Sequence, residues 1–322
     1  MAIARLKQLW KNEYFQTAVT IVLIIVIVFG FWFGSQAVLN TSYPALDVAS
    51  TSMLPTLNVG DLIIVQGIPA SQIHANYTTG DIIVFKSIGD PNRRIVHRAV
   101  EITVQDGQYL ITTRGDNNPS NDGNLVPEAN LIGRVVGKVP FLGNFALFTN
   151  ALGTFYLFII AAVIILIIVL ALPSGRKEDK SAAEPKKRRM IGNIDAKWIY
   201  LLIVEVILVG LVFFSLWGSF TFWQIGADPP QYVTIRGMFP DAAWYETFTR
   251  SYNDVSAAYL SQGLFTYKVD ALVGGLIRPG VPTLSWAQFL LAILIIVNAW
   301  MLVQWIRERR TKETAPVPTV GT

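Results

Sequence analysis

The sequence contains no cysteine, so disulfide bonds, thiolate nucleophiles and cysteine-based zinc sites are all excluded. It contains only two histidines, His74 and His97, and these are its only candidates for an imidazole base. Charged residues are also scarce, at 15% of the chain, whereas hydrophobic residues make up 52%. This balance is unusual for a soluble domain and indicates a membrane protein with exposed domains of modest size.

Long apolar stretches account for this composition. Four of them approach or exceed the length that crosses about 30 Å of hydrocarbon. We expect membrane-spanning helices at residues 17–39, 146–172, 198–217 and 286–306. The first stretch could instead be a cleavable signal peptide, but its apolar run is longer than is usual for one, so a retained anchor is favoured.

Basic residues lie on one side of the membrane if all four stretches cross it. They cluster in an N-terminal segment, a central linker and a C-terminal tail, which are residues 1–16, 173–197 and 307–322. The positive-inside rule predicts that these segments are cytoplasmic and that residues 40–145 and 218–285 lie outside. The basic run from Lys186 to Arg189 joins two spans, so we expect it to set topology and expect no nucleic-acid partner.

The first outer segment, residues 40–145, has the pattern of a β-rich domain. Short β-branched runs separated by Gly, Asp, Asn and Pro clusters occur at residues 61–65, 81–85, 94–100 and 108–113. They predict a compact antiparallel sheet or a barrel-like sandwich. The fold class is therefore a membrane protein of the α+β type.

The second outer segment, residues 218–285, is rich in aromatic residues and contains no histidine. We expect one or two amphipathic helices between Ala242 and Gln262. Two interpretations remain open: a small folded cap packed on the membrane or on the first domain, and a module that docks a partner or substrate.

Three polar blocks of the first outer segment carry candidate chemistry. Ser52 opens the run Ser-Met-Leu-Pro-Thr-Leu, His97 lies in a predicted strand, and Asp116 and Asp122 lie in a polar stretch that follows. Brought together in space, Ser, His and Asp can activate a hydroxyl for acyl transfer. The other histidine lies in a polar loop, so His97 is the favoured base. Met53 and Leu57 are apolar residues beside Ser52, which suits a site that receives an apolar peptide.

Several blocks in this order resemble those of the type I signal peptidases, over roughly residues 15–175. His97 stands where the common bacterial branch generally has lysine. The run Gly115-Asp116-Asn117-Asn118 also resembles the branch found in archaea and the endoplasmic reticulum. The resemblance implies a β-rich catalytic domain resting on the membrane, with no metal and no organic cofactor.

The resemblance also implies roles for individual residues. Ser52 would be the nucleophile, His97 the base and Asp122 the acid that orients it, with Asp116 supporting the site. Spacing alone cannot order the two aspartates. The backbone N–H of Ser52 and the hydroxyl of Ser50 would stabilise the oxyanion.

The predicted function is a membrane-bound serine endopeptidase that removes signal peptides from exported preproteins. Its expected partners are those signal peptides, the lipid bilayer and the protein-export translocon. The expected location is the plasma membrane of a prokaryote, archaeal in type, with several spans and the catalytic domain outside. Alternatives are a specialised peptidase for a narrow set of precursors and a non-catalytic membrane scaffold. Because all assigned residues precede Leu172, we expect a protein without residues 191–322 to keep at least partial activity.

Overall fold

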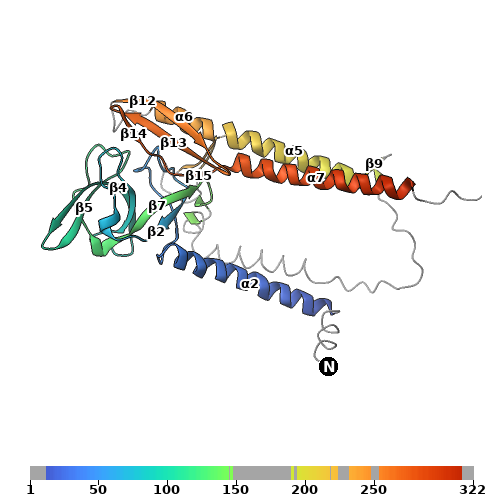
Figure 1. Cartoon of the computed structure of the whole chain (residues 1–322), viewed down its shortest axis with the longest axis horizontal. Helices are drawn as coiled ribbons and strands as arrows, with labels where there is room; N and C mark the ends of the chain where they lie inside the picture. Colours follow the sequence, from blue (N-terminus) through green and yellow to red (C-terminus); the bar gives the residue numbers. More distant parts are fainter. Residues whose placement is uncertain are drawn as a thin grey trace, which may run out of the picture.

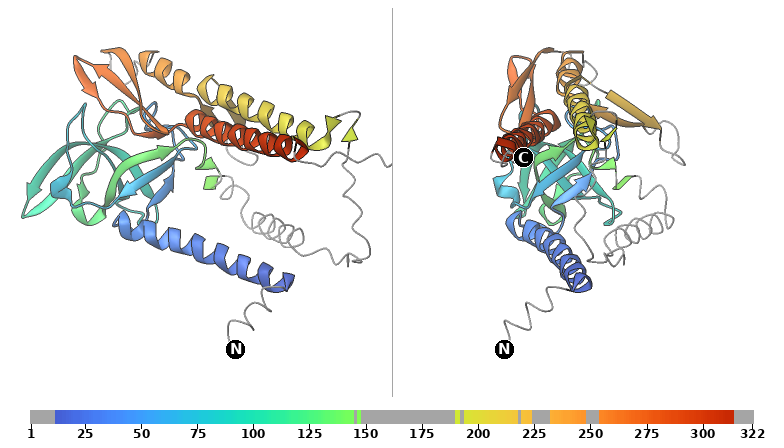
Figure 2. Two further views of the ribbon diagram at one scale, coloured as in Figure 1. Left: turned by 45° about the vertical axis from the view of Figure 1, so that its right-hand side comes forward. Right: turned by 90° about the vertical axis from the view of Figure 1, so that its right-hand side faces the viewer.

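Three long helices extend in the same general direction from a β-rich body (Figures 1 and 2). The computed structural model describes residues 12–144, 146–147, 190–191, 194–217, 219–223, 232–247 and 254–313. The long helices are α2 (Glu13–Val38), α5 (Ala196–Trp217) and α7 (Trp286–Glu313). Helix α2 begins after Asn12, whose side chain accepts a hydrogen bond from the backbone N–H of Tyr14 at 2.9 Å, as an N-cap does. Helices α5 and α7 pack along each other (Figure 1).

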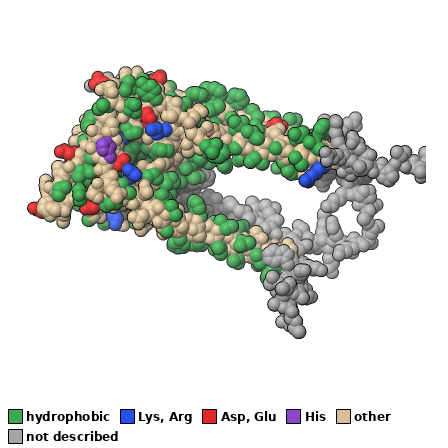
Figure 3. Space-filling view, in the orientation of Figure 1, with side chains coloured by type: hydrophobic (Ala, Val, Ile, Leu, Met, Phe, Trp, Pro, Cys, Tyr) green, Lys and Arg blue, Asp and Glu red, His purple; other side chains and the backbone are tan. Residues whose placement is uncertain are grey.

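Each long helix is apolar enough to cross a membrane. The candidate spans are Tyr14–Val38, Trp198–Trp217 and Trp286–Arg307. Hydrophobic side chains cover these helices, whereas acidic and basic side chains gather mainly on the β-rich body (Figure 3). Three of the four predicted spans are therefore present as helices of suitable length. All but two residues of the predicted span at 146–172 lie outside the described residues.

The first half of the chain folds into antiparallel strands. They are β1 (Ala45–Asp47), β2 (Leu62–Gln66), β3 (Ile82–Lys86), β4 (Arg94–Gln105), β5 (Gln108–Arg114), β6 (Val126–Pro127) and β7 (Leu131–Val139). Short 3-10 turns lie at Ala70–Gln72 and Glu128–Asn130. The four predicted strands are β2 to β5, each within one residue of its predicted start. Strand β7, which was not predicted, pairs with both β2 and β3 and lies at the centre of the domain.

Between α5 and α7, the second half is also largely strand. Besides these two helices, its described elements are β8 (Met190–Ile191), β9 (Ile194–Asp195), β10 (Ser219–Trp223), β11 (Tyr232–Arg236), α6 (Met238–Thr247), β12 (Val255–Gln262), β13 (Thr266–Val273), β14 (Leu276–Arg278) and β15 (Thr283–Leu284). The expectation of helices between Ala242 and Gln262 is half wrong, because α6 ends at Thr247 and residues 255–262 form β12. Antiparallel pairing with β13, for example Leu260 with Val269, decides this conformation.

One continuous sheet joins the two halves. Its strand order is β12-β13-β15-β7-β3-β4-β5-β6, so β15 of the second half pairs with β7 of the first. The pairing is parallel, at Thr283 and Lys138, and the N–H of Lys138 donates to the carbonyl oxygen of Pro282 at 2.8 Å. The indole N–H of Trp286, at the start of α7, donates to the carbonyl oxygen of Pro140 at 3.0 Å. The second half therefore extends the sheet of the first instead of only covering it.

Apolar side chains beneath the Ser52 loop form one of three core clusters among the described residues. Met53 and Leu57 are fully buried in it, against Val48, Ile63 and Val65. The expectation that Met53 and Leu57 line a substrate surface is therefore wrong. Full burial of such a side chain stabilises a fold by about 1.5–3 kcal/mol, so these two residues anchor the loop that carries Ser52.

Candidate active site

Ser52 lies in a hydrogen-bonded turn between β1 and β2. The N–H of Leu57 donates to the carbonyl oxygen of Met53 at 2.9 Å, which closes the turn after Ser52. The base of the loop is closed by a bond from the N–H of Val48 to the carbonyl oxygen of Asp61 at 2.9 Å. With Met53 and Leu57 held in the core, the loop presents the Ser52 hydroxyl from a fixed backbone.

His97 approaches Ser52 from strand β4, which pairs with β3 and β5. Its Nε2 atom lies 3.1 Å from the Ser52 hydroxyl oxygen. The residue is paired with Ile83 of β3, and the ring of Phe85 meets the imidazole edge-on at 6.5 Å between centroids. Only 8% of His97 is exposed. The imidazole is therefore held by the sheet within hydrogen-bonding distance of the hydroxyl.

Asp122 contacts the other side of the same imidazole. Its Oδ2 atom lies 2.5 Å from His97 Nδ1 and also accepts a 2.6 Å hydrogen bond from the Thr113 hydroxyl. The backbone N–H of Asp122 donates to the carbonyl oxygen of Thr113 at 2.8 Å. An ionised carboxylate only accepts hydrogen bonds, so Nδ1 carries the proton here. The lone pair of Nε2 is then left facing the Ser52 hydroxyl.

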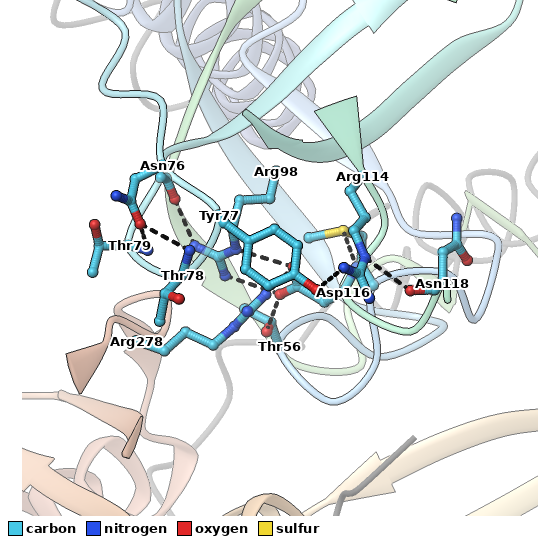
Figure 4. Close-up of polar contacts among 12 residues, drawn as sticks. Thr56, Asn76, Tyr77, Thr78, Thr79, Arg98, Arg114, Asp116, Asn118 and Arg278 are labelled. Carbon is cyan, nitrogen blue, oxygen red and sulfur yellow. Dashed lines mark hydrogen bonds and ion pairs between the residues drawn. The ribbon is translucent and has the colours of Figure 1, made fainter. Parts of the chain in front are cut away.

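Asp116 lies elsewhere and does not contact His97. Arg98 donates to both of its carboxylate oxygens, from Nε at 3.0 Å and from Nη2 at 2.9 Å. The Thr56 hydroxyl donates to it at 2.5 Å, and Arg278 of β14 forms a second ion pair with it (Figure 4). Of the two aspartates that spacing could not order, the structure brings Asp122 to the imidazole and Asp116 to two arginines.

The charge of Asp116 is fixed by these arginines. Burial by itself raises the pKa of the Asp116 carboxyl, but the guanidinium groups of Arg278 and Arg98 outweigh burial and hold the pKa well below its usual range. Asp116 is therefore an anion in the folded protein at any ordinary pH.

Two further residues considered from the sequence are Ser50 and His74, and only Ser50 lies beside Ser52. The Ser50 hydroxyl oxygen lies 3.1 Å from the Ser52 hydroxyl oxygen, at the exposed surface of the same loop. His74 is exposed and its Nε2 lies 3.1 Å from the Thr79 hydroxyl oxygen. Ser50 is thus part of the cluster around Ser52, whereas His74 bonds with residues of its own loop, Thr79 and Asp81.

Sequence reasoning missed several residues that hold the site together. The backbone N–H of Asn117 donates to the carbonyl oxygen of Ser52 at 2.7 Å, and its side chain donates to that of Thr51 at 3.0 Å. Gly115 passes so close that a Cβ atom there would lie 2.7 Å from the Ser52 carbonyl oxygen. Both residues flank a predicted acid, which was a usable signal. No sequence signal pointed to Arg278, because it lies in the second half of the chain, far from the three polar blocks.

Comparisons with known proteins fit this geometry. The model of the family described as "Signal peptidase, peptidase S26" matches residues 11–102. The human signal peptidase complex catalytic subunit SEC11C is 27% identical over 164 residues, which cover 48% of this chain and 83% of the relative. The corresponding subunit of Dictyostelium discoideum is 31% identical over 141 residues, covering 41% of this chain and 75% of the relative. That of Lachancea thermotolerans is 31% identical over 125 residues, covering 36% and 71%.

These similarities agree with the resemblance seen in the sequence blocks. The matched length covers most of each relative but less than half of this chain. On the strength of these matches, the chain belongs to the signal peptidase family, peptidase S26, and within it resembles the SEC11 catalytic subunits.

Proposed function

We propose that this protein is a membrane-bound serine endopeptidase that removes signal peptides from preproteins. The observation that carries the proposal is the chain of contacts from Ser52 to His97 to Asp122, at 3.1 Å and 2.5 Å. A hydroxyl, an imidazole and a carboxylate linked in this order are the components of nucleophilic acyl transfer. A scaffold without activity would have no need of this alignment.

In the first step, Nε2 of His97 takes the Ser52 hydroxyl proton while the oxygen attacks the scissile carbonyl carbon. The Asp122 carboxylate stabilises the resulting imidazolium and keeps its ring oriented. The developing oxyanion would accept hydrogen bonds from the Ser52 backbone N–H and from the Ser50 hydroxyl, which lies beside the nucleophile.

In the second step, the protonated Nε2 gives its proton to the leaving amine, and the mature protein departs. A water molecule then loses a proton to His97 and attacks the acyl-enzyme, which releases the signal peptide as a carboxylic acid and restores the Ser52 hydroxyl. These steps use the protein groups named here and one water molecule.

The location of the site suits substrates whose own apolar segment lies in a bilayer. Ser52 follows the candidate span Tyr14–Val38 closely in the chain, and the other two candidate spans leave the β-rich body in the same general direction (Figure 1). Together with the basic flanking segments, this arrangement supports a multi-pass protein with the catalytic domain on the extracytoplasmic side. Its partners would be the signal peptides of exported preproteins, the lipid bilayer and the translocon that delivers the substrates.

Cleavage of a labelled preprotein by purified protein in detergent or proteoliposomes tests the proposal. The Ser52→Ala variant should be folded and inactive, because loss of a triad member commonly costs several orders of magnitude in rate. His97→Ala should be about as inactive, and the double variant no worse than either. His74→Ala is the matched control and should cleave like the wild type. Near wild-type cleavage by Ser52→Ala would exclude the serine mechanism.

A further inference from the structure

The second half of the chain reaches into the buried support of the Ser52 loop. Arg278 ends strand β14, where its backbone pairs with Ala271 of β13. The following turn is fixed by a 2.8 Å hydrogen bond from the N–H of Gly280 to the carboxylate of Asp270. Figure 4 shows the Arg278 side chain extending toward Asp116 and Thr56, which belong to the first half.

The charges that meet there are almost completely removed from solvent. Exposed fractions are 3% for Arg278, 2% for Arg98 and 1% for Asp116. Buried charges are tolerated when they are paired and hydrogen-bonded, and removing one partner leaves an uncompensated charge. Asp116 is thus held by Arg98 of β4 in the first half and by Arg278 of β14 in the second half.

Asp116 is coupled to the nucleophile loop through direct contacts. It accepts a hydrogen bond from the hydroxyl of Thr56, four positions after Ser52, at 2.5 Å. Its chain neighbour Asn117 donates its backbone N–H to the Ser52 carbonyl oxygen at 2.7 Å. A displacement of Asp116 would therefore act at two points, Ser52 and Thr56, on the loop that presents the Ser52 hydroxyl to His97.

We propose that Arg278 is a positioning residue, supplied by the second half of the chain, that holds Asp116 and through it the Ser52 loop in the reactive arrangement. Residues 218–285 are then neither a simple cap nor only a docking module. This segment supplies the Arg278 guanidinium group, which completes the support of the active site. The inference rests on the proposed peptidase function for its kinetic part and on the contacts alone for its structural part.

The kinetic test compares Arg278→Met with the wild type in preprotein cleavage. A shift of the loop by about 1 Å can cost about 100-fold in rate, so kcat should fall by about that factor while KM changes little. Arg278→Lys keeps the positive charge and should recover part of kcat. Ile277→Thr is the matched control, because Ile277 precedes Arg278 in the same strand but has an exposed side chain. It should behave as the wild type.

A double-mutant cycle with Asp116→Asn separates positioning from a general loss of stability. If Arg278 acts through Asp116, the Arg278→Met/Asp116→Asn protein should be no less active than Asp116→Asn alone. Multiplicative effects of the two changes would show that Arg278 acts by another route.

Hydrogen exchange provides a readout that does not depend on peptidase activity. Peptides covering residues 50–58 and 114–118 should exchange faster in Arg278→Met than in the wild type or Ile277→Thr, at temperatures where all three are folded. Unchanged exchange in these peptides would overturn the inference whether or not the wild type cleaves preproteins. If the wild type fails to cleave but the exchange changes as expected, the proposed function fails and the positioning contact stands.

Discussion

The backbone N–H of Asn117 donates a 2.7 Å hydrogen bond to the carbonyl oxygen of Ser52. This contact joins the loop of the candidate nucleophile to the turn that leads to the candidate acid Asp122. Replacements other than proline leave the backbone donor and acceptor in place, so the close approach is best tested at the residues that permit it. Gly115 is the most restrictive of them, because its backbone lies against the same carbonyl oxygen.

Replacing Gly115 with alanine should therefore lower both stability and activity. The new Cβ atom would lie 2.7 Å from the Ser52 carbonyl oxygen and 2.7 Å from Asn118 Nδ2. Overpacking of this kind typically costs about 1–3 kcal/mol, and here it would displace Ser52 itself. Gly123→Ala is the control, since a Cβ atom at Gly123 meets nothing within 4 Å. Thermal unfolding and preprotein cleavage measure the two effects, and equal behaviour of the two variants would contradict the account.

Thr113→Val should reduce cleavage while leaving the fold intact. The change keeps the shape of the side chain but removes the hydroxyl that donates to Asp122 Oδ2 at 2.6 Å. Asp122 would then orient His97 less strictly, and we expect a loss of about 10-fold, in the range of one supporting hydrogen bond. Thr112→Val is the neighbouring control, since Thr112 belongs to the same strand and successive side chains of a strand point to opposite faces. A wild-type rate for Thr113→Val would show that Asp122 needs no help from this hydroxyl.

The buried Asp116 predicts a dependence of stability on pH. Its pKa in the folded protein is lower than the unfolded value of about 3.9. A depressed carboxyl pKa stabilises the fold above the unfolded value, and this contribution is lost as the pH falls toward the folded value. Asp116→Asn lacks the contribution and leaves Arg98 and Arg278 without their common anion, at a cost of about 3–5 kcal/mol near neutral pH.

The difference in unfolding temperature between wild type and Asp116→Asn should therefore shrink as the pH is lowered from about 7 to about 3. Thermal unfolding of the detergent-solubilised proteins across this range measures it. A difference that stays constant with pH would mean that the carboxylate charge contributes nothing to stability.

The sequence predicted those features whose cause is local. Long apolar runs identified α2, α5 and α7, and β-branched runs between turn residues identified β2 to β5. The Ser52, His97 and Asp122 candidates were chosen partly from a family resemblance, and the structure places them in contact. Features that depend on distant pairing were missed. Strand β12 was expected to be helical because its pairing with β13 is not visible in its own residues.

Burial in loops was equally hard to predict. Met53 and Leu57 flank a candidate nucleophile near a membrane, which suggested a substrate surface, yet both fill the core beneath the loop. The contact between Arg278 and Asp116 joins residues of different halves, and neither residue's neighbours indicate it. Contacts that form only in the folded chain, such as the pairing of β15 with β7, bring the two halves together.

The orientation of the spans can be tested because the chain has no cysteine. Single cysteines introduced into residues 40–145 and 218–285 should react with an impermeant thiol reagent in intact cells. Ala183→Cys, in the basic linker, should react only after the membrane is opened, because basic segments stay on the cytoplasmic side. Labelling of Ala183→Cys in intact cells would contradict the predicted topology. A lack of labelling at several positions of both outer segments would contradict it as well.

Removal of residues 191–322 tests the relation between the halves most directly. From the positions of the candidate residues alone, at least partial activity was expected to survive. The structure changes this expectation, because the truncated protein would lose the pairing of β15 with β7 and the Arg278 partner of Asp116. Loss of a buried ion-pair partner and of packing beneath the loop should remove most of the activity and a large part of a marginal stability.

Supplying residues 191–322 as a separate chain in the same cells distinguishes the two causes. If the second half completes the site, co-expression should restore cleavage, and the same fragment with Arg278→Met should restore folding but little activity. Protease resistance of the first half reports its folding in each case. A truncated protein that is folded and fully active without the fragment would show that the peptidase half is self-sufficient and that Arg278 has no part in positioning Ser52.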